Sequence, residues 1–240
     1  MLNLNKVYLG DCLNVMDDID DKSIALVLCD LPYGTTKCSW DEVISFDLLW
    51  KQYERIISDN GLIILHGSQP FTSKLILSNL NLFRYSLVWA KTRNSYPFFA
   101  KKRPLPQHED ILIFGNGKTY NPQMVKSDKP FKRNSRAKGH LDGDKEGVKW
   151  DGVSTTHNER YPTSVLKISN PSSECVFHPT QKPIQLCEYL IKTYSNENEV
   201  VLDNCAGSGS TLVAAKNLNR PFIGIEKEKK YYDICIERLK

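Results

Sequence analysis

Two apolar runs, one near each end of the chain, are each followed by a segment suited to holding a ligand. Residues 24–29, Ile-Ala-Leu-Val-Leu-Cys, lead into Asp-Leu-Pro-Tyr-Gly at residues 30–34. Residues 199–202, Glu-Val-Val-Leu, lead into Asp-Asn-Cys-Ala-Gly-Ser-Gly-Ser-Thr at residues 203–211. Apolar runs of this length are typical of strands that are buried on both faces. The pattern therefore predicts two buried strands, each ending in a ligand-binding loop.

The alternation of apolar runs and amphipathic stretches predicts the fold class. We expect strands at 6–9, 24–29, 62–66, 86–90, 110–114, 200–203 and 222–226, and helices at 12–16, 46–58, 71–80, 184–194, 211–218 and 229–239. Strands that alternate with helices predict an α/β fold with a doubly wound, mostly parallel sheet. Ligands of such sheets bind beyond the carboxyl ends of the strands, where both loops are expected.

The middle of the chain differs from its two ends. Residues 115–171 show little apolar periodicity, and Lys, Asn, Ser, Gly and Asp dominate them. A loop of this length without regular structure is uncommon in a compact domain and is usually functional or disordered. We predict one domain at 1–240, with residues 115–171 as an insertion that reaches toward a partner.

Charge is also segregated along the chain. Residues 91–140 contain twelve Lys or Arg and three Asp or Glu, a balance of +9, whereas the whole chain carries +4. A polyanionic partner would explain this segregation. A solvated basic insertion would explain it as well, and charge alone does not decide between the two.

Composition argues against several other classes of protein. No stretch approaches the roughly 18 apolar residues of a membrane span, and the first ten residues do not resemble a signal peptide. The seven cysteines are scattered, and no pair has Cys-x-x-Cys spacing. That pattern argues against a disulfide framework or a zinc site and favours a reducing compartment. We expect a cytoplasmic protein with no membrane partner and no metal.

The segment at 203–211 favours a nucleotide-like cofactor. Gly207 and Gly209 would let the backbone approach a ligand closely, and the N-terminus of the next helix favours an anion or a polar nucleoside. The spacing is neither a phosphate loop nor a typical dinucleotide fingerprint. Glu226, 23 residues after Asp203, is placed to accept hydrogen bonds from ribose hydroxyls. The structural alternatives are helix N-terminal roles for Glu226 and for Asp11.

The segment at 30–34 favours chemistry on an exocyclic amine. The lone pair of such an amine is delocalised into the base, so accepting both its protons in hydrogen bonds would localise the lone pair. The Asp30 carboxylate supplies one acceptor, and a backbone carbonyl in the turn that Pro32 rigidifies supplies the other. Tyr33 offers a face on which the base can stack. The alternative is a simple strand-ending turn.

These segments resemble the motifs of a known family. Residues 30–34 resemble the Asp/Asn/Ser-Pro-Pro-Tyr/Phe motif of S-adenosylmethionine-dependent DNA methyltransferases that act on amino groups. Residues 203–209 resemble their cofactor motif, and residues 178–183, His-Pro-Thr-Gln-Lys-Pro, resemble a segment that regularly precedes it. The order of motifs is similar to that of the beta group, a circular permutation of the class I methyltransferase sheet. The resemblance covers nearly the whole chain outside residues 115–171.

The resemblance implies a role for each matching residue. Asp30 and the Leu31 carbonyl would hold the target amine, next to Pro32, and Tyr33 would stack on the flipped base. In the cofactor site, Asp203 and Gly207 would contact the methionine end of the cofactor, together with Thr180 and Lys182. Glu226 would bind the ribose, and Asp11 would bind the adenine. The full set of implied cofactor residues is Asp11, Cys12, His178, Thr180, Gln181, Lys182, Asp203, Cys205, Ala206, Gly207, Gly209, Ser210, Thr211 and Glu226.

The chain departs from the family pattern at two places. Leu31 replaces the usual first proline, which should be tolerated because the residue is expected to act through its carbonyl. Asn204 and Cys205 replace a commoner Pro-Phe pair, and the change removes an expected aromatic contact to the cofactor.

The resemblance implies site-specific methylation of duplex DNA. Asp at position 30 is the choice of most adenine-specific members, so N6 of a flipped-out adenine is the expected target. The insertion at 115–171 would choose the sequence. The family also allows a homodimer and a cognate restriction endonuclease as partners, in a bacterial or phage-infected cell. Phosphate contacts are expected from Lys101, Lys102, Arg103, Lys132, Arg133 and Arg136.

Four other functions compete with this one. Cytosine N4 or an RNA base would keep the fold and change the amine. A protein-glutamine methyltransferase would prefer Asn at position 30 and would leave the basic middle unexplained. A catalytically inactive DNA-binding subunit is favoured by Cys205, whereas the intact Asp30, Tyr33, Gly207 and Glu226 argue against it.

Overall fold

The computed structural model describes residues 2–36, 38, 41–94, 97–136, 150–171, 177 and 181–240, with the backbone alone at 133–136 and 150–154. The chain divides into two compact units. The first comprises residues 1–121 and 164–240, and the second comprises residues 122–163.

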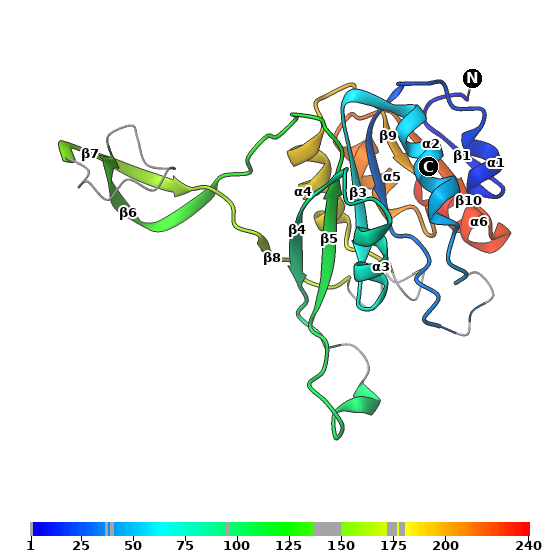
Figure 1. The fold of residues 1–240 in the computed structure, drawn as a ribbon, viewed down its shortest axis with the longest axis horizontal. Helices are drawn as coiled ribbons and strands as arrows, with labels where there is room; N and C mark the ends of the chain where they lie inside the picture. Colours follow the sequence, from blue (N-terminus) through cyan, green and yellow to red (C-terminus); the bar gives the residue numbers. More distant parts are fainter. Residues whose placement is uncertain are drawn as a thin grey trace. The chain divides into compact units, whose positions relative to one another are not determined.

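The first unit is built around an eight-stranded sheet with the order β1-β10-β9-β2-β3-β5-β4-β8 (Figure 1). The strands from β1 to β3 in this order are parallel, whereas β5 is antiparallel to both β3 and β4. This confirms the predicted α/β class and mostly parallel sheet; the circular permutation stays a prediction. The strands are β1 (Lys6–Leu9), β2 (Ile24–Cys29), β3 (Ile57–Gly67), β4 (Phe83–Ala90), β5 (His108–Phe114), β8 (Val165–Lys167), β9 (Val201–Asp203) and β10 (Phe222–Glu226).

Helices cover both faces of this sheet. Alternate strand residues point to opposite faces, and apolar side chains on both faces need to be buried. Leu26 and Leu28 of β2 lie in a buried cluster with residues of α4, α5 and α6, and Val27 and Cys29 lie in a second cluster with residues of α1, α2 and α3. Burial of each large apolar side chain contributes about 1.5–3 kcal/mol. The helices are α1 (Cys12–Met16), α2 (Phe46–Ile56), α3 (Phe71–Ser78), α4 (Ile184–Tyr194), α5 (Ser210–Asn217) and α6 (Lys229–Arg238), with a 3-10 turn η1 (Pro97–Phe99). None of the helices in the described part of the chain is long and apolar enough to cross a membrane.

One edge of the sheet collects strand ends from distant parts of the sequence. The carboxyl ends of the parallel strands β2, β3, β9 and β10 meet there, as parallel strands must. The antiparallel β5 brings its amino end to the same edge, because Asp110 pairs with Gly67 at the carboxyl end of β3. The carboxyl end of β4 joins them, since Ala90 pairs with His108.

The second unit is a pair of antiparallel strands, β6 (Val125–Arg136) and β7 (Trp150–Arg160). These strands lie within the 115–171 region, where we expected no regular structure. Their backbones pair through the ladder, but charged residues interrupt any apolar alternation, so the sequence gives little sign of them. Phe131 of β6 lies under the Arg160 guanidinium, 4.1 Å from ring centroid to Cζ.

The end of the predicted insertion belongs to the main sheet. β8 pairs in parallel with β4, and its central residue Leu166 is buried in the cluster on one face. The separate unit at 122–163 is therefore shorter at both ends than the predicted insertion at 115–171.

Candidate active site

A cavity of about 790 Å³ opens at the sheet edge described above, within the first unit. It is lined by both predicted loops, although they are far apart in the sequence. Other residues of the cavity wall come from the start of β5 and from the segment that precedes α4. The predicted site residues that line it are Asp11, Cys12, Asp30, Leu31, Pro32, Tyr33, Arg103, Gln181, Lys182, Asp203, Cys205, Ala206, Gly207, Ser210, Thr211 and Glu226.

Four other predicted residues that the structure describes do not line this cavity, namely Gly209, Lys101, Lys102 and Lys132. Gly209 begins α5 with φ +79°, and a Cβ there would lie 2.4 Å from Cys235 Sγ, so this glycine serves the packing of α5 against α6. Lys101 and Lys102 are exposed after η1, and Lys132 lies on β6 in the second unit. His178 and Thr180, and the side chains of Arg133 and Arg136, lie outside what the structure describes.

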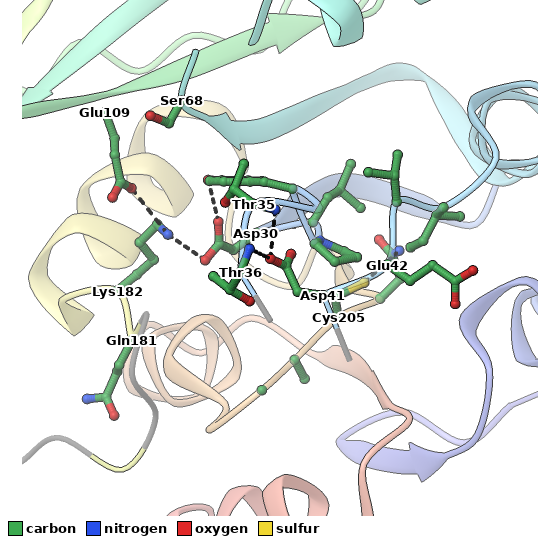
Figure 2. A pocket seen from close by; sticks show the side chains of 18 of the residues that line it. Asp30, Thr35, Thr36, Asp41, Glu42, Ser68, Glu109, Gln181, Lys182 and Cys205 are labelled. Atoms are coloured by element: carbon green, nitrogen blue, oxygen red, sulfur yellow. Dashed lines mark hydrogen bonds and ion pairs between the residues drawn. The ribbon is translucent and has the colours of Figure 1, made fainter. Parts of the chain in front are cut away.

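Both oxygens of the Asp30 carboxylate have a protein partner. The Tyr33 hydroxyl donates to Oδ1 at 2.7 Å, and the Lys182 ammonium pairs with Oδ2 (Figure 2). The Lys182 side chain is 7% exposed and that of Asp30 is 23% exposed. These contacts fix the orientation of the carboxylate at the end of β2. The expected contact of Lys182 with the cofactor stays a prediction.

Tyr33 and Leu31 are placed by packing. The Tyr33 ring stacks on Phe71 with 4.8 Å between centroids and 26° between planes. Burial raises the pKa of Tyr33, and the negative charge of Asp30 adds to this effect, so its hydroxyl remains a donor. Leu31 is 3% exposed and packs in the core on the α2 face. Core packing therefore holds the Leu31 side chain in place.

Asp41, which the sequence analysis missed, holds the turn after Tyr33. Its carboxylate accepts the backbone N–H groups of Thr35 at 2.9 Å and Thr36 at 2.6 Å (Figure 2). It also accepts the backbone N–H of Gly34 at 2.9 Å. Burial opposes ionisation, but these hydrogen bonds outweigh it and lower the pKa of Asp41. Gly34 has φ +67°, and a Cβ there would lie 2.8 Å from the Val43 side chain, so glycine is required.

Glu109, at the start of β5, is a second residue that the sequence analysis missed. Its Oε2 lies 3.2 Å from the Lys182 ammonium, and its Oε1 pairs with Lys91 at the end of β4. Burial disfavours the charged carboxylate, but Lys182 and Lys91 outweigh burial and lower the pKa of Glu109 to about 2. Burial likewise opposes the charge of Lys182, while Asp30 and Glu109 raise its pKa. The four residues, Asp30, Lys182, Glu109 and Lys91, form a partly buried, charge-balanced cluster.

Three carboxylates line the part of the cavity near the loop after β9. Asp203 is 3% exposed and accepts the N–H of Cys205 at 3.2 Å, and burial raises its pKa to about 7. Glu226 accepts the N–H of Gly207 at 2.7 Å, and burial also raises its pKa. Asp11 caps α1 by accepting the N–H of Leu13 at 3.0 Å. The capping role of Asp11 is therefore present, and Glu226 accepts the N–H of Glu228, the residue before α6, at 2.8 Å. Both residues also line the cavity.

Two adjacent residues connect the two loops. Gln181 accepts a hydrogen bond from the Ser208 hydroxyl at 3.1 Å, in the glycine loop after β9. Lys182 pairs with Asp30 in the loop after β2. The short segment before α4 therefore touches both halves of the cavity.

Comparison with known sequences gives a family. A family model described as DNA methylase, of the N6/N4 methyltransferase group, matches residues 24–237. The Type II methyltransferase M.HindIII of Haemophilus influenzae is 39% identical over 292 residues, which cover 97% of this chain and 94% of that protein. M1.MboII of Moraxella bovis, also a Type II methyltransferase, is 29% identical over 258 residues, covering 96% and 95%.

Solved structures share the fold. The M1.HpyAVI–SAM complex aligns with a TM-score of 0.66 at 24% identity and covers 98% of each chain. The cytosine-N4-specific PvuII DNA methyltransferase aligns with a TM-score of 0.69 at 16% identity, covering 99% of this chain and 87% of that one. With a family match over most of its length, the chain belongs to the N6/N4 DNA methylase family.

Proposed function

We propose that the protein transfers a methyl group from S-adenosylmethionine to the exocyclic N6 amine of an adenine flipped out of duplex DNA. The observation that carries the proposal is the shared cavity. Asp30, the expected acceptor for the amine, lines the same cavity as Asp203 and Glu226, the expected cofactor residues. A donor and an acceptor of the methyl group can therefore meet without a movement of whole domains.

The residues of the glycine loop fit S-adenosylmethionine. The cavity is large enough for a nucleoside cofactor and a base, since binding sites for such molecules measure about 300–1,000 Å³. The buried Asp203 carboxyl suits an ammonium group, which would favour its charged form. Glu226 and Asp11 each have further lone pairs for ribose and adenine groups. When bound, the cofactor supplies a methyl group that is already activated on a sulfonium.

The protein's own residues mainly position the reactants. Asp30 can accept the target amine without losing its present partners, because each carboxylate oxygen has two acceptor sites. Tyr33, held against Phe71, offers the face on which the base would stack, worth about 1–3 kcal/mol. That gain offsets part of the few kcal/mol needed to unstack the base. Alignment of this kind contributes roughly 7–11 kcal/mol to a two-reactant step.

The DNA side of the proposal rests on exposed basic residues. Arg103 lines the cavity, and its guanidinium lies 4.7 Å from the centroid of the Phe99 ring. In the second unit, a two-stranded ribbon is the kind of element that a DNA major groove admits. We infer that β6 and β7 read the target sequence. The homodimer, the cognate endonuclease and the cytoplasmic location stay predictions.

The test is a product analysis. The purified protein is incubated with S-adenosylmethionine and mixed-sequence duplex DNA, and the digested nucleosides are identified by mass spectrometry. We expect N6-methyladenine. N4-methylcytosine would keep the mechanism and overturn the base assignment.

The absence of any methylated nucleoside, with cofactor binding intact, would overturn the proposal. The same incubation with the Asp30→Ala variant is the matched control. If the methylated nucleoside is produced in this cavity, the Asp30→Ala variant must not produce it.

A further inference from the structure

We propose that Glu109 is a positioning residue for the methyl transfer, which balances the charge of Lys182 so that this ammonium does not cancel the effect of the Asp30 carboxylate on the target amine. The inference rests on the proposed function and adds a residue that acts through another. Glu109 would not touch the base; it would set the electrostatics of the residue that does.

The geometry places Lys182 between two carboxylates. Figure 2 shows its ammonium joined on one side to Asp30 and on the other to Glu109. The side chains of Lys182 and Glu109 are only 7% and 16% exposed, so water screens the interaction weakly. Lys91, with its side chain 9% exposed, contacts the other oxygen of Glu109.

Charge balance in this cluster depends on Glu109. Two ammonium groups, on Lys91 and Lys182, face two carboxylates, on Asp30 and Glu109. His66, buried nearby, is neutral at pH 7 because burial lowers its pKa to about 4. Without Glu109, Lys91 would lose its carboxylate partner and Lys182 would keep only Asp30. Breaking a buried pair in this way leaves an uncompensated charge.

The uncompensated cation would oppose the reaction. In the transfer, the amine nitrogen bonds to the methyl carbon while the carbon–sulfur bond breaks and its electron pair goes to sulfur. The amine thus gains positive charge before it gives up one proton to water. A carboxylate aimed at this developing charge stabilises the transition state, and a nearby unbalanced ammonium cancels part of that effect. Glu109 removes this penalty by pairing with Lys182.

The experiment is a double-mutant cycle. Glu109→Gln keeps the shape of the side chain and removes its charge, and we expect kcat to fall about 10- to 100-fold. The Kd for S-adenosylmethionine should change less than about threefold, because Glu109 acts on the amine's side of the reaction. In a Lys182→Met background, the same substitution should change kcat less than about threefold. The matched control is Glu188→Gln on α4, whose carboxylate accepts a hydrogen bond from Asn217.

An equal fall in kcat in both backgrounds would overturn the proposal, and so would the absence of a fall in the wild-type background. Glu109→Asp keeps the charge and separates an electrostatic role from a folding defect. We expect it to be at least about fivefold more active than Glu109→Gln. Equal losses in the two variants would mean that Glu109 is merely structural.

A second readout is independent of methylation. Proton titration of Lys182, followed by NMR of its labelled side chain, should show a lower pKa in Glu109→Gln than in wild type. An unchanged pKa would overturn the inference even if the enzyme is active. If wild type methylates no DNA while the pKa falls as expected, the proposed function fails and the ion-pair assignment stands.

Discussion

The loops after β2 and after β9 hold their carboxylates in different ways. In the loop after β2, Asp30 pairs with Lys182, which is 152 residues away in the chain. In the glycine loop, Asp203 accepts the N–H of Cys205 only two residues on. The first arrangement exists only in the assembled fold, whereas the second is largely local. We therefore expect the orientation of Asp30 to be sensitive to distant substitutions and the orientation of Asp203 to be sensitive mainly to residues of its own loop.

The largest expected effect is that of Asp30→Ala. Removing the carboxylate removes the acceptor for the amine, and we expect methylation to fall at least about 1,000-fold. Cofactor affinity should stay within a few-fold, because the glycine loop keeps its own contacts. Radiolabelled methyl transfer and calorimetry measure the two quantities. Retention of most activity would contradict the mechanism.

Two substitutions of Tyr33 separate the contribution of ring stacking from that of the hydroxyl group. Tyr33→Ala removes the base platform, and we expect kcat/KM to fall about 100-fold. Tyr33→Phe keeps the ring and loses one hydrogen bond to a charged group, with an expected loss of about tenfold. Steady-state kinetics on one duplex compares the two variants. Equal losses would show that the ring itself contributes nothing.

Glu226→Gln tests whether the glycine loop affects cofactor affinity separately from kcat. We expect the Kd for S-adenosylmethionine to rise about tenfold, because a charge-assisted acceptor for the ribose is lost. At saturating cofactor, kcat should stay within about threefold. Glu237→Gln, which changes an exposed carboxylate on α6, is the matched control. A large fall in kcat would argue that the two halves are not separable.

Substitution of Asp203 gives the most pH-dependent effect. Its folded pKa is raised to about 7, so its contribution to stability is present at low pH and is lost as the pH rises through 7. Asp203→Asn should therefore stabilise the apo protein by about 1–3 kcal/mol at pH 8, with the gain vanishing by pH 4. Thermal unfolding across this range measures it. A gain that does not depend on pH would rule out the buried charge as its cause.

The fold was largely predictable because its signals are local. The apolar runs of β2 and β10 and the amphipathic helices need no knowledge of their neighbours, and their predicted bounds agree closely with the structure. β6 and β7 were missed because charged residues break their alternation. β8 was missed because a three-residue strand carries almost no pattern of its own.

The site was predictable only in part, for a related reason. Asp30 and Gly207 follow parallel strands, whose carboxyl ends are the places to look for ligands. Glu109 stands at the amino end of a strand, and only the antiparallel direction of β5 brings it to the same edge. The sequence does not specify that direction. The one available signal was a charged residue beside an otherwise buried strand.

The adjacent residues Gln181 and Lys182 have a thermodynamic consequence. Gln181 contacts Ser208 in the glycine loop, and Lys182 contacts Asp30 in the loop after β2. A ligand bound at either loop therefore affects the same dipeptide. If one ligand changes the conformation of this dipeptide, it changes the affinity for the other ligand. Linkage requires that the two affinities change by the same factor. If bound cofactor raises the affinity for DNA, bound DNA must raise the affinity for cofactor by the same factor. A titration of DNA into the cofactor complex and a titration of cofactor into the DNA complex must therefore give the same coupling constant.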